Sequence, residues 1–194
     1  MSPSNAMERS YTAIKEMLRT GMFVSGARLE ANRLAYELGV SVTPVRDVLY
    51  RLAGEQLVDA TIGEGFHVPR FSESALRDLY EWHSALLLLA SRTVDIRTAL
   101  AAKGDTTLPV ADRTAAMFER IASIVPNREI CSAMLSASDR LQPFRLVEIA
   151  IFADVEQEFD ALSLLDATAA IAVRRYHLRR MRAVPELLQA RDRR

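Results

Sequence analysis

The sequence predicts a mainly α-helical protein: an N-terminal winged helix-turn-helix with a small β-hairpin wing, followed by an all-α helical bundle. Within residues 29–52, two short runs carry apolar side chains at helical spacing and are separated by Gly39. A glycine-flanked hairpin pattern follows over residues 63–68. From Ser72 onward the apolar spacing is helical, and the sequence shows no strand pattern. We therefore expect one domain over residues 8–70 and a second over residues 71–194.

The helix-turn-helix has start and stop signals in the expected places. Gly39 can end the first helix, because the residue after a helix often adopts a left-handed conformation. Ser41 and Thr43 are candidates for the N-cap of the second helix, and Pro44 suits its first position. The buried stripe of the second helix is expected to consist of Val45, Val48, Leu49 and Leu52. Arg46 is left on the outer face, which is the arrangement that places side chains in a DNA major groove.

The second half of the sequence predicts a series of helices. They are expected to begin near Ser72, Leu108, Asn127, Pro143, Asp166 and Pro185, with a loop over residues 102–107. The stretch 174–182 is rich in arginine and has two interpretations. It is either a second DNA-binding patch or a solvated helix face that pairs with the acidic residues of 154–160.

The composition favours an intracellular, cytoplasmic protein without enzymatic activity. Cys131 is the single cysteine, which excludes an internal disulfide. No apolar run approaches the roughly 20 residues of a membrane span, and residues 1–6 lack the apolar centre of a signal peptide. We expect residues 1–7 to be a disordered tail or a remnant of an expression vector. With 3 histidines, the sequence shows no nucleophile–base pair and no paired carboxylates that indicate catalysis.

A spaced set of residues runs through the N-terminal domain. It comprises Gly21, Gly26, Leu29, Leu34, Ala35, Leu38, Gly39, Val40, Ser41, Thr43, Pro44, Val45, Arg46, Asp47, Leu49, Arg51, Leu52, Gly63 and Gly65. This pattern resembles the GntR family of winged-helix bacterial transcription regulators. The resemblance implies a dimer that binds a double-stranded DNA operator with two half-sites.

The resemblance also implies which residues touch DNA. The implied contacts are Asn32, Arg33, Ser41, Thr43, Arg46, Arg51 and Gly65. Arg46 is the candidate for bidentate reading of a guanine edge. Arg51 lies farther along the helix, where it either contacts the DNA backbone or stays solvated. Gly65 lets the wing approach the minor groove without a side chain in the way.

The charge balance is unusual for a DNA-binding module. The chain holds 25 basic and 25 acidic residues, and residues 1–70 hold eight of each. Neutralising phosphates normally supplies much of the affinity for DNA. Two departures from the family pattern contribute: Val42 stands where arginine is common, and Glu64 stands between the wing glycines. We therefore expect modest monomer affinity and binding that depends on dimerisation.

The helical half resembles the FCD-type effector domain that follows the winged helix in one GntR branch. The similarity lies in residues 79–81, 127–137 and 154–177. Members of that branch often hold a divalent metal with one Asp and three His. Three of those ligand positions hold Asn127, Cys131 and Val155 here, so only His177 remains and we expect no metal and no cofactor. A zinc site built from Cys131, His177 and His83 would lack a fourth ligand.

The same resemblance gives a candidate effector pocket lined by His83, Asn127, Cys131 and His177. Either the pocket takes a small-molecule effector, an organic acid or a less polar metabolite, or the domain serves mainly for dimerisation. The leading hypothesis is a dimeric, sequence-specific DNA-binding regulator that acts as a repressor. The alternative is a regulator-derived protein-interaction module with weak or lost DNA binding. Neither hypothesis involves a membrane.

Overall fold

The computed structural model describes residues 3–94, 105–163 and 169–193. The chain is mainly α-helical and divides into two compact units, one ending at Arg70 and one running from Phe71 to Arg193. Within the described ranges, no helix combines the length and the apolarity needed to cross a bilayer.

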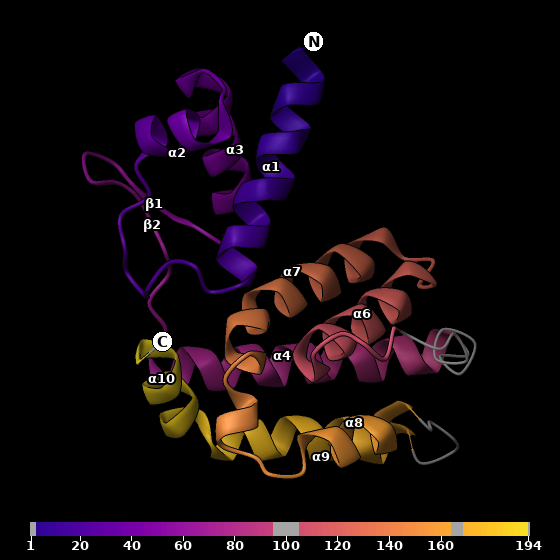
Figure 1. Ribbon diagram of the computed structural model, residues 1–194. Helices are drawn as coiled ribbons and strands as arrows, with labels where there is room; N and C mark the ends of the chain where they lie inside the picture. The colour runs from indigo at the N-terminus through magenta and orange to yellow at the C-terminus, as the bar shows by residue number, and fades with distance from the viewer. Residues whose placement is uncertain (1–2, 95–104, 164–168, 194) are drawn as a thin grey trace. The chain divides into compact units, whose positions relative to one another are not determined.

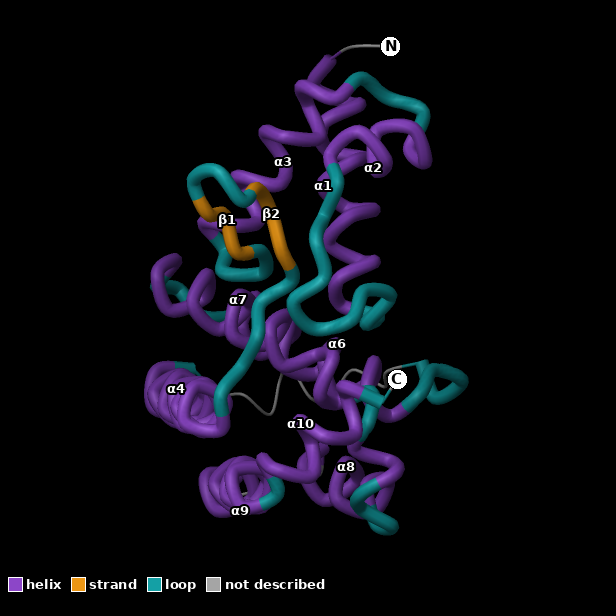
Figure 2. Tube along the Cα trace, turned by 90° about the vertical axis from the view of Figure 1, so that its left-hand side faces the viewer, coloured by secondary structure: helices purple, strands orange, loops and turns teal. Residues whose placement is uncertain are grey.

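The N-terminal unit is a three-helix bundle with a two-stranded wing (Figures 1 and 2). Its elements are α1 (Pro3–Arg19), α2 (Ala31–Leu38), α3 (Val42–Gly54), β1 (Asp59–Thr61) and β2 (Gly65–His67). The strands are antiparallel, with Ala60 opposite Phe66. An additional bridge joins Arg28 to His67, so the segment before α2 is held against the wing.

Helix α1 corrects one expectation from the sequence. It begins at Pro3, so the described part of the 1–7 segment is helical and not a disordered tail. Met7 packs against the core of the unit, and Ile14 and Leu18 are buried on the same face. An apolar stripe at helical spacing therefore continues into this segment and stabilises its helical conformation.

The helix-turn-helix forms for the reasons that the sequence indicates. Gly39 ends α2 with φ of +64°, and its N–H bonds back to the end of that helix. The stripe Val45, Val48, Leu49 and Leu52 is buried, as predicted. Ser41 occupies the N-cap position of α3, but its side chain makes no capping hydrogen bond, and Thr43 lies inside the helix. The hydroxyl of Ser41 is therefore not used to cap the helix.

The C-terminal unit is all-helical over its described residues. Its elements are α4 (Glu73–Thr93), α6 (Val110–Ser123), α7 (Arg128–Arg145), the 3₁₀ turn η1 (Glu148–Ala150), α8 (Val155–Ser163), α9 (Ala169–Arg182) and α10 (Val184–Asp192). Helix α4 packs against α7 on one side and α9 on the other, and α6 packs along α7 (Figure 1). The side chain of Ser72 caps α4 by accepting a hydrogen bond from the backbone N–H of Ala75.

Pro143 does not open a helix, contrary to the expectation from the sequence. It lies near the end of α7, which continues to Arg145. The missing N–H of proline removes one backbone hydrogen bond from this last turn. Leu141 and Phe144 are completely buried here, and their packing offsets that loss. The expected helix start at Asp166 and part of the expected loop 102–107 fall outside the described residues.

Two arginines of α9, Arg179 and Arg180, pair with acidic residues, as the second interpretation of this stretch expects for its members. Arg179 forms an ion pair with Asp154, and its Nη1 lies 3.5 Å from Oε2 of Glu158. Arg180 differs from a solvated side chain, because it is only 1% exposed. Its Nη2 lies 2.6 Å from Oε2 of Glu148 and its Nη1 2.6 Å from Oε2 of Glu158. Arg180 therefore belongs to the interior of the unit.

Candidate nucleic-acid interface

Helix α3 turns one face to the core of the N-terminal unit and the other to solvent. Outside its apolar stripe, the helix exposes Thr43, Arg46, Asp47 and Tyr50. Arg46 and Tyr50 are four residues apart, so they lie on the same face of the helix. This face has the polar and aromatic groups that a recognition helix presents to base edges.

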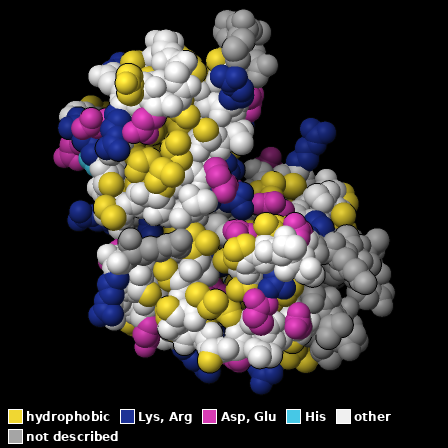
Figure 3. Space-filling model, viewed as in Figure 1, with side chains coloured by type: hydrophobic (Ala, Val, Ile, Leu, Met, Phe, Trp, Pro, Cys, Tyr) yellow, Lys and Arg dark blue, Asp and Glu magenta, His cyan; other side chains and the backbone are white. Residues whose placement is uncertain are grey.

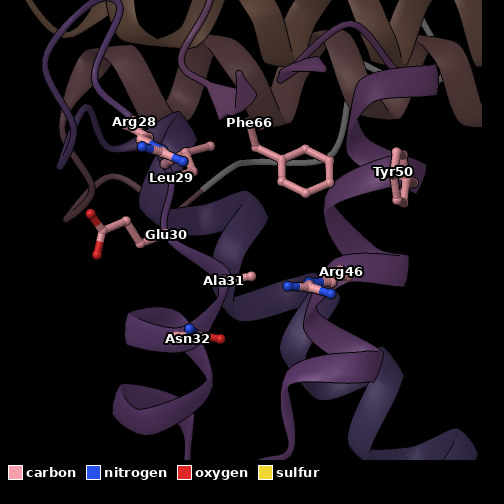
Figure 4. Close-up of a pocket in the computed structure, with 9 residues that line it drawn as sticks. Arg28, Leu29, Glu30, Ala31, Asn32, Arg46, Tyr50 and Phe66 are labelled. Atoms are coloured by element: carbon pink, nitrogen blue, oxygen red, sulfur yellow. The ribbon is translucent and has the colours of Figure 1, made fainter. Parts of the chain in front are cut away.

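A concave surface of about 420 Å³ lies between α2, α3 and the wing (Figure 4). Its lining includes Arg28, Asn32, Arg46, Tyr50, Gly65 and Phe66. In Figure 4, Arg46 extends from α3 toward the start of α2, whereas the carboxylate of Glu30 points away from it. The structure thus brings together three predicted contact residues, Asn32, Arg46 and Gly65.

Two cations on this surface are not neutralised by the protein. Arg28 and Arg46 make no ion pair and no side-chain hydrogen bond within the described part of the chain. Arg33 differs, since its Nε donates to Oε1 of Glu37 at 2.8 Å. That pair is on the surface, where the Arg33 side chain is 74% exposed, so it is easily exchanged for another anion. Arg28 and Arg46 can therefore bind phosphates or base edges without first breaking an ion pair.

Arg51 is placed differently from the other predicted contacts. Its guanidinium stacks on the ring of Tyr11 in α1, with 3.6 Å between Cζ and the ring centroid. Its Nη1 lies 2.8 Å from Oε1 of Glu8, and its Nε 3.6 Å from Oε1 of Glu55. The side chain joins α3 to α1 and is neither freely solvated nor directed at the concave surface.

The wing is held to α3 by an aromatic contact. The rings of Tyr50 and Phe66 meet edge to face at 75°, with 4.8 Å between centroids. Gly65 has φ of +90°, a conformation that other residues rarely adopt. The backbone of the turn therefore requires glycine at this position. The tip exposes Ile62 and Glu64 in place of basic side chains. On the face in Figure 3, acidic and basic side chains alternate around the wing.

Sequence reasoning did not identify Arg28 and Tyr50 as members of this surface. Tyr50 could have been found, because it lies one helical turn after Arg46 on the outer face of α3. Arg28 reaches the surface through its bridge to His67, 39 positions later in the sequence. No local pattern around Arg28 indicates that pairing.

The candidate effector pocket of the C-terminal unit is only partly assembled. His83 and His177 are both completely buried, and Nδ1 of His83 lies 2.9 Å from Nε2 of His177. Asn127 has a different role. It is exposed and caps α7, accepting hydrogen bonds from the backbone N–H groups of Glu129 and Ile130. The side-chain oxygen of Asn127 is used by the helix terminus, and a role of Asn127 in an effector pocket stays a prediction. Cys131 packs against the main core of the unit.

Both histidines of the pair are neutral. Burial lowers the pKa of His177 from 6.5 to about 3, and Arg180 and Arg145 act in the same direction. Burial also lowers the pKa of His83, with a further contribution from His177. Among the residues that the structure describes, no three His, Cys, Asp or Glu side chains form a group suited to a metal ion. The absence of a metal remains a prediction.

The comparison with known proteins places the N-terminal unit. Residues 7–68 match the model of a family described as bacterial regulatory proteins, gntR family. The HTH-type transcriptional regulator McbR of Escherichia coli is 34% identical over 77 residues, which cover 40% of this chain and 35% of McbR. The uncharacterised HTH-type transcriptional regulator MT0049 of Mycobacterium tuberculosis is 31% identical over 78 residues, or 40% of this chain and 32% of that protein. The aligned part spans about a third of each relative's length.

Two solved structures resemble the chain over nearly its whole length. A protein of Rhodococcus sp. RHA1, assigned as a transcriptional regulator GntR, has a TM-score of 0.69 at 18% identity, covering 93% of this chain and 97% of its own. Escherichia coli McbR/YncC has a TM-score of 0.56 at 21% identity, covering 95% and 93%. At these identities the likeness concerns the fold. Residues 7–68 form a winged helix-turn-helix, and this segment matches the model of the bacterial regulatory proteins, gntR family.

Proposed function

We propose that this chain is a sequence-specific DNA-binding transcriptional regulator that acts in the cytoplasm as a dimer and represses its target genes. The observation that carries the proposal is the pair of unneutralised arginines, Arg28 and Arg46, on one concave surface beside the wing. Leaving cations without a protein partner is useful where a polyanion binds, because phosphates then displace only water and counterions.

The residues of the N-terminal unit divide into positioning and reading groups. Arg46 and Tyr50 face outward from α3 and are the groups that read base edges. Arg28, Asn32 and the hydroxyls at the start of α3 contact the DNA backbone, together with the free N–H groups of that helix end. Arg33 joins them by exchanging Glu37 for a phosphate. Arg51 holds α1 on α3 and is not assigned a DNA contact.

The C-terminal unit, over residues 71–194, is proposed to form the dimer and to bind a small effector, in the manner of an FCD-type domain. A dimer supplies two recognition helices for two half-sites about one helical turn of DNA apart. That arrangement offsets the weak electrostatic attraction expected from eight basic and eight acidic residues in positions 1–70.

The charge balance also supports a second candidate function. The wing tip exposes Glu64 and Ile62. Neither side chain is basic, so the tip does not attract the phosphates of DNA. A regulator-derived module that binds another protein would carry such a tip.

A salt-dependent gel shift with DNA from beside the chain's own gene separates the two functions. A DNA-binding regulator gives a discrete complex whose log affinity falls linearly with log salt, and scrambled DNA of equal length binds at least tenfold more weakly. If purified dimer gives no complex at low salt, or binds both DNAs equally, the regulator proposal fails. Sedimentation of the same sample reports whether the protein is a dimer.

A further inference from the structure

Helix α3 contributes two side chains to the concave surface beside the wing. They are Arg46 and Tyr50, which lie one helical turn apart. Tyr50 is 63% exposed, so most of its ring is available to a ligand. Its hydroxyl makes no hydrogen bond within the part of the chain that the structure describes. Tyr50 therefore presents an aromatic ring to whatever occupies this surface.

The wing holds the ring of Tyr50 in place. The ring of Phe66 on β2 meets it edge to face, with 4.8 Å between the centroids, and Phe66 itself is only 9% exposed. In Figure 4 the Phe66 ring extends from the wing toward α3, beside Tyr50. A ring that is already packed on one side loses less rotamer freedom when it binds, so its use in an interface costs less conformational entropy.

The major groove of DNA offers one apolar group to such a ring. Base edges there present hydrogen-bond donors and acceptors, together with the C5-methyl group of thymine. The ring carbons of tyrosine neither donate nor accept, so they gain free energy from a methyl group and lose it when they cover a polar edge. Arg46, one turn earlier, supplies the donors that read a guanine.

Helix geometry sets the distance between the two bases. Four residues of an α-helix advance about 6 Å along its axis, and successive base pairs are stacked about 3.4 Å apart. With α3 lying along the major groove, the base that meets Tyr50 is one or two steps from the base that meets Arg46.

We propose that Tyr50 sets a preference for thymine in the bound DNA by packing its ring on the C5-methyl group, one or two base pairs from the guanine that Arg46 reads. Tyr50 is outside the set of residues that carries the resemblance to the GntR family, whereas its neighbours Leu49 and Arg51 belong to that set. The preference is therefore assigned to this chain and not to the shared motif. It rests on the proposed DNA-binding function and adds a base identity to it.

The test replaces thymine with uracil, which removes the methyl group and keeps every hydrogen-bonding group of the base. The probe is the duplex that the parent chain enriches from a random DNA library, with deoxyuridine at one thymine at a time. At the thymine that Tyr50 contacts, loss of the methyl should weaken binding about fourfold. In a second arm, cytosine and 5-methylcytosine are compared at that position, each paired with guanine. The methylated base should bind more tightly by a similar factor.

Variants assign the effect to the ring. Tyr50→Ala should bind the thymine and uracil duplexes equally, whereas Tyr50→Phe should keep the fourfold ratio because it keeps the ring. Tyr36→Ala is the matched control, since Tyr36 is 89% exposed on α2 and does not line the concave surface. This control should also keep the ratio. A purely structural role of Tyr50 against Phe66 would change the overall affinity and leave the ratio in place.

The inference is overturned if no thymine of the enriched duplex shows the ratio, if Tyr50→Ala keeps it, or if Tyr50→Phe loses it. It is also overturned if cytosine and 5-methylcytosine bind equally. In each of these outcomes the parent chain still binds a specific sequence, so the proposed function stands. A parent chain that enriches no sequence overturns the proposed function, and this inference with it.

Discussion

Nδ1 of His83 lies 2.9 Å from Nε2 of His177, and both rings are completely buried in the C-terminal unit. His177 also donates from Nδ1 to the carbonyl of Val173 at 2.7 Å. Both nitrogens of His177 are therefore engaged, and the pair is neutral. This arrangement has consequences for acid stability and for metal binding.

The buried pair predicts that the C-terminal unit loses stability as the pH falls below about 6.5. The pKa of His177 is about 3 in the folded state and near 6.5 in the unfolded chain, so between these values the unfolded state binds more protons. Unfolding is therefore favoured progressively as the pH falls through this window. His177→Gln, followed by Trp82 fluorescence, should flatten the dependence of Tm on pH between 7 and 4.

His67 supplies the control for this experiment. It lies on β2 in the other unit and is only partly buried. His67→Gln should leave the pH dependence reported by Trp82 unchanged. An identical slope for His177→Gln and the parent chain would show that His177 is not held neutral.

We expect no tightly bound divalent metal. His177 has no free lone pair for a metal, since both of its nitrogens are in hydrogen bonds, and the Asn127 oxygen caps α7. Elemental analysis of untagged protein should find well under one metal per chain, and a chelator should leave Tm unaltered. A stoichiometric metal, or a fall in Tm on chelation, would contradict this arrangement of the histidines.

Arg28→Ala should weaken DNA binding by a similar factor for every sequence tested. Arg28 has no protein partner and lies where the segment before α2 meets the wing, so it is suited to a phosphate contact. Loss of one such contact reduces the slope of log affinity against log salt by about 1. Arg77→Ala in the other unit serves as the control. A change of base preference without a change of slope would mean that Arg28 reads bases instead.

Glu64→Arg should increase DNA affinity and steepen its salt dependence. Glu64 is exposed at the wing tip, so the substitution exchanges a repelled group for one that can neutralise a phosphate, with a slope change of about 1. Val42→Arg is less suitable, because Val42 packs against the core of the unit. Glu81→Arg, the same charge change at an exposed position of α4, is the matched control. Equal slopes for Glu64→Arg and Glu81→Arg would show that the wing tip does not face the duplex.

The sequence predicts the helix-turn-helix well because its signals are local. Gly39 ends α2, and the stripe from Val45 to Leu52 is buried as its spacing indicates. Predictions fail where a non-local contact decides the outcome. Packing of Met7 against the core makes the N-terminal segment helical, and burial of Leu141 and Phe144 carries α7 past Pro143.

The functional residues divide in the same way. Asn32, Arg46 and Gly65 follow from their positions in the motif and meet on the concave surface. Arg51 was also implied by its position in the motif, but its guanidinium stacks on Tyr11 and pairs with Glu8 of α1, a helix distant in sequence.

Selection from a random DNA library with the parent chain and with Arg46→Ala tests the proposed function most directly. If Arg46 reads a guanine edge, the parent should enrich a motif with two related half-sites, and Arg46→Ala should lose preference at one position in each. Its affinity for the parent's site should fall by about 1–3 kcal/mol, while its affinity for unrelated DNA changes little. An unchanged motif with a folded Arg46→Ala variant, or no enriched motif from the parent chain, would contradict the assignment of α3 as a recognition helix.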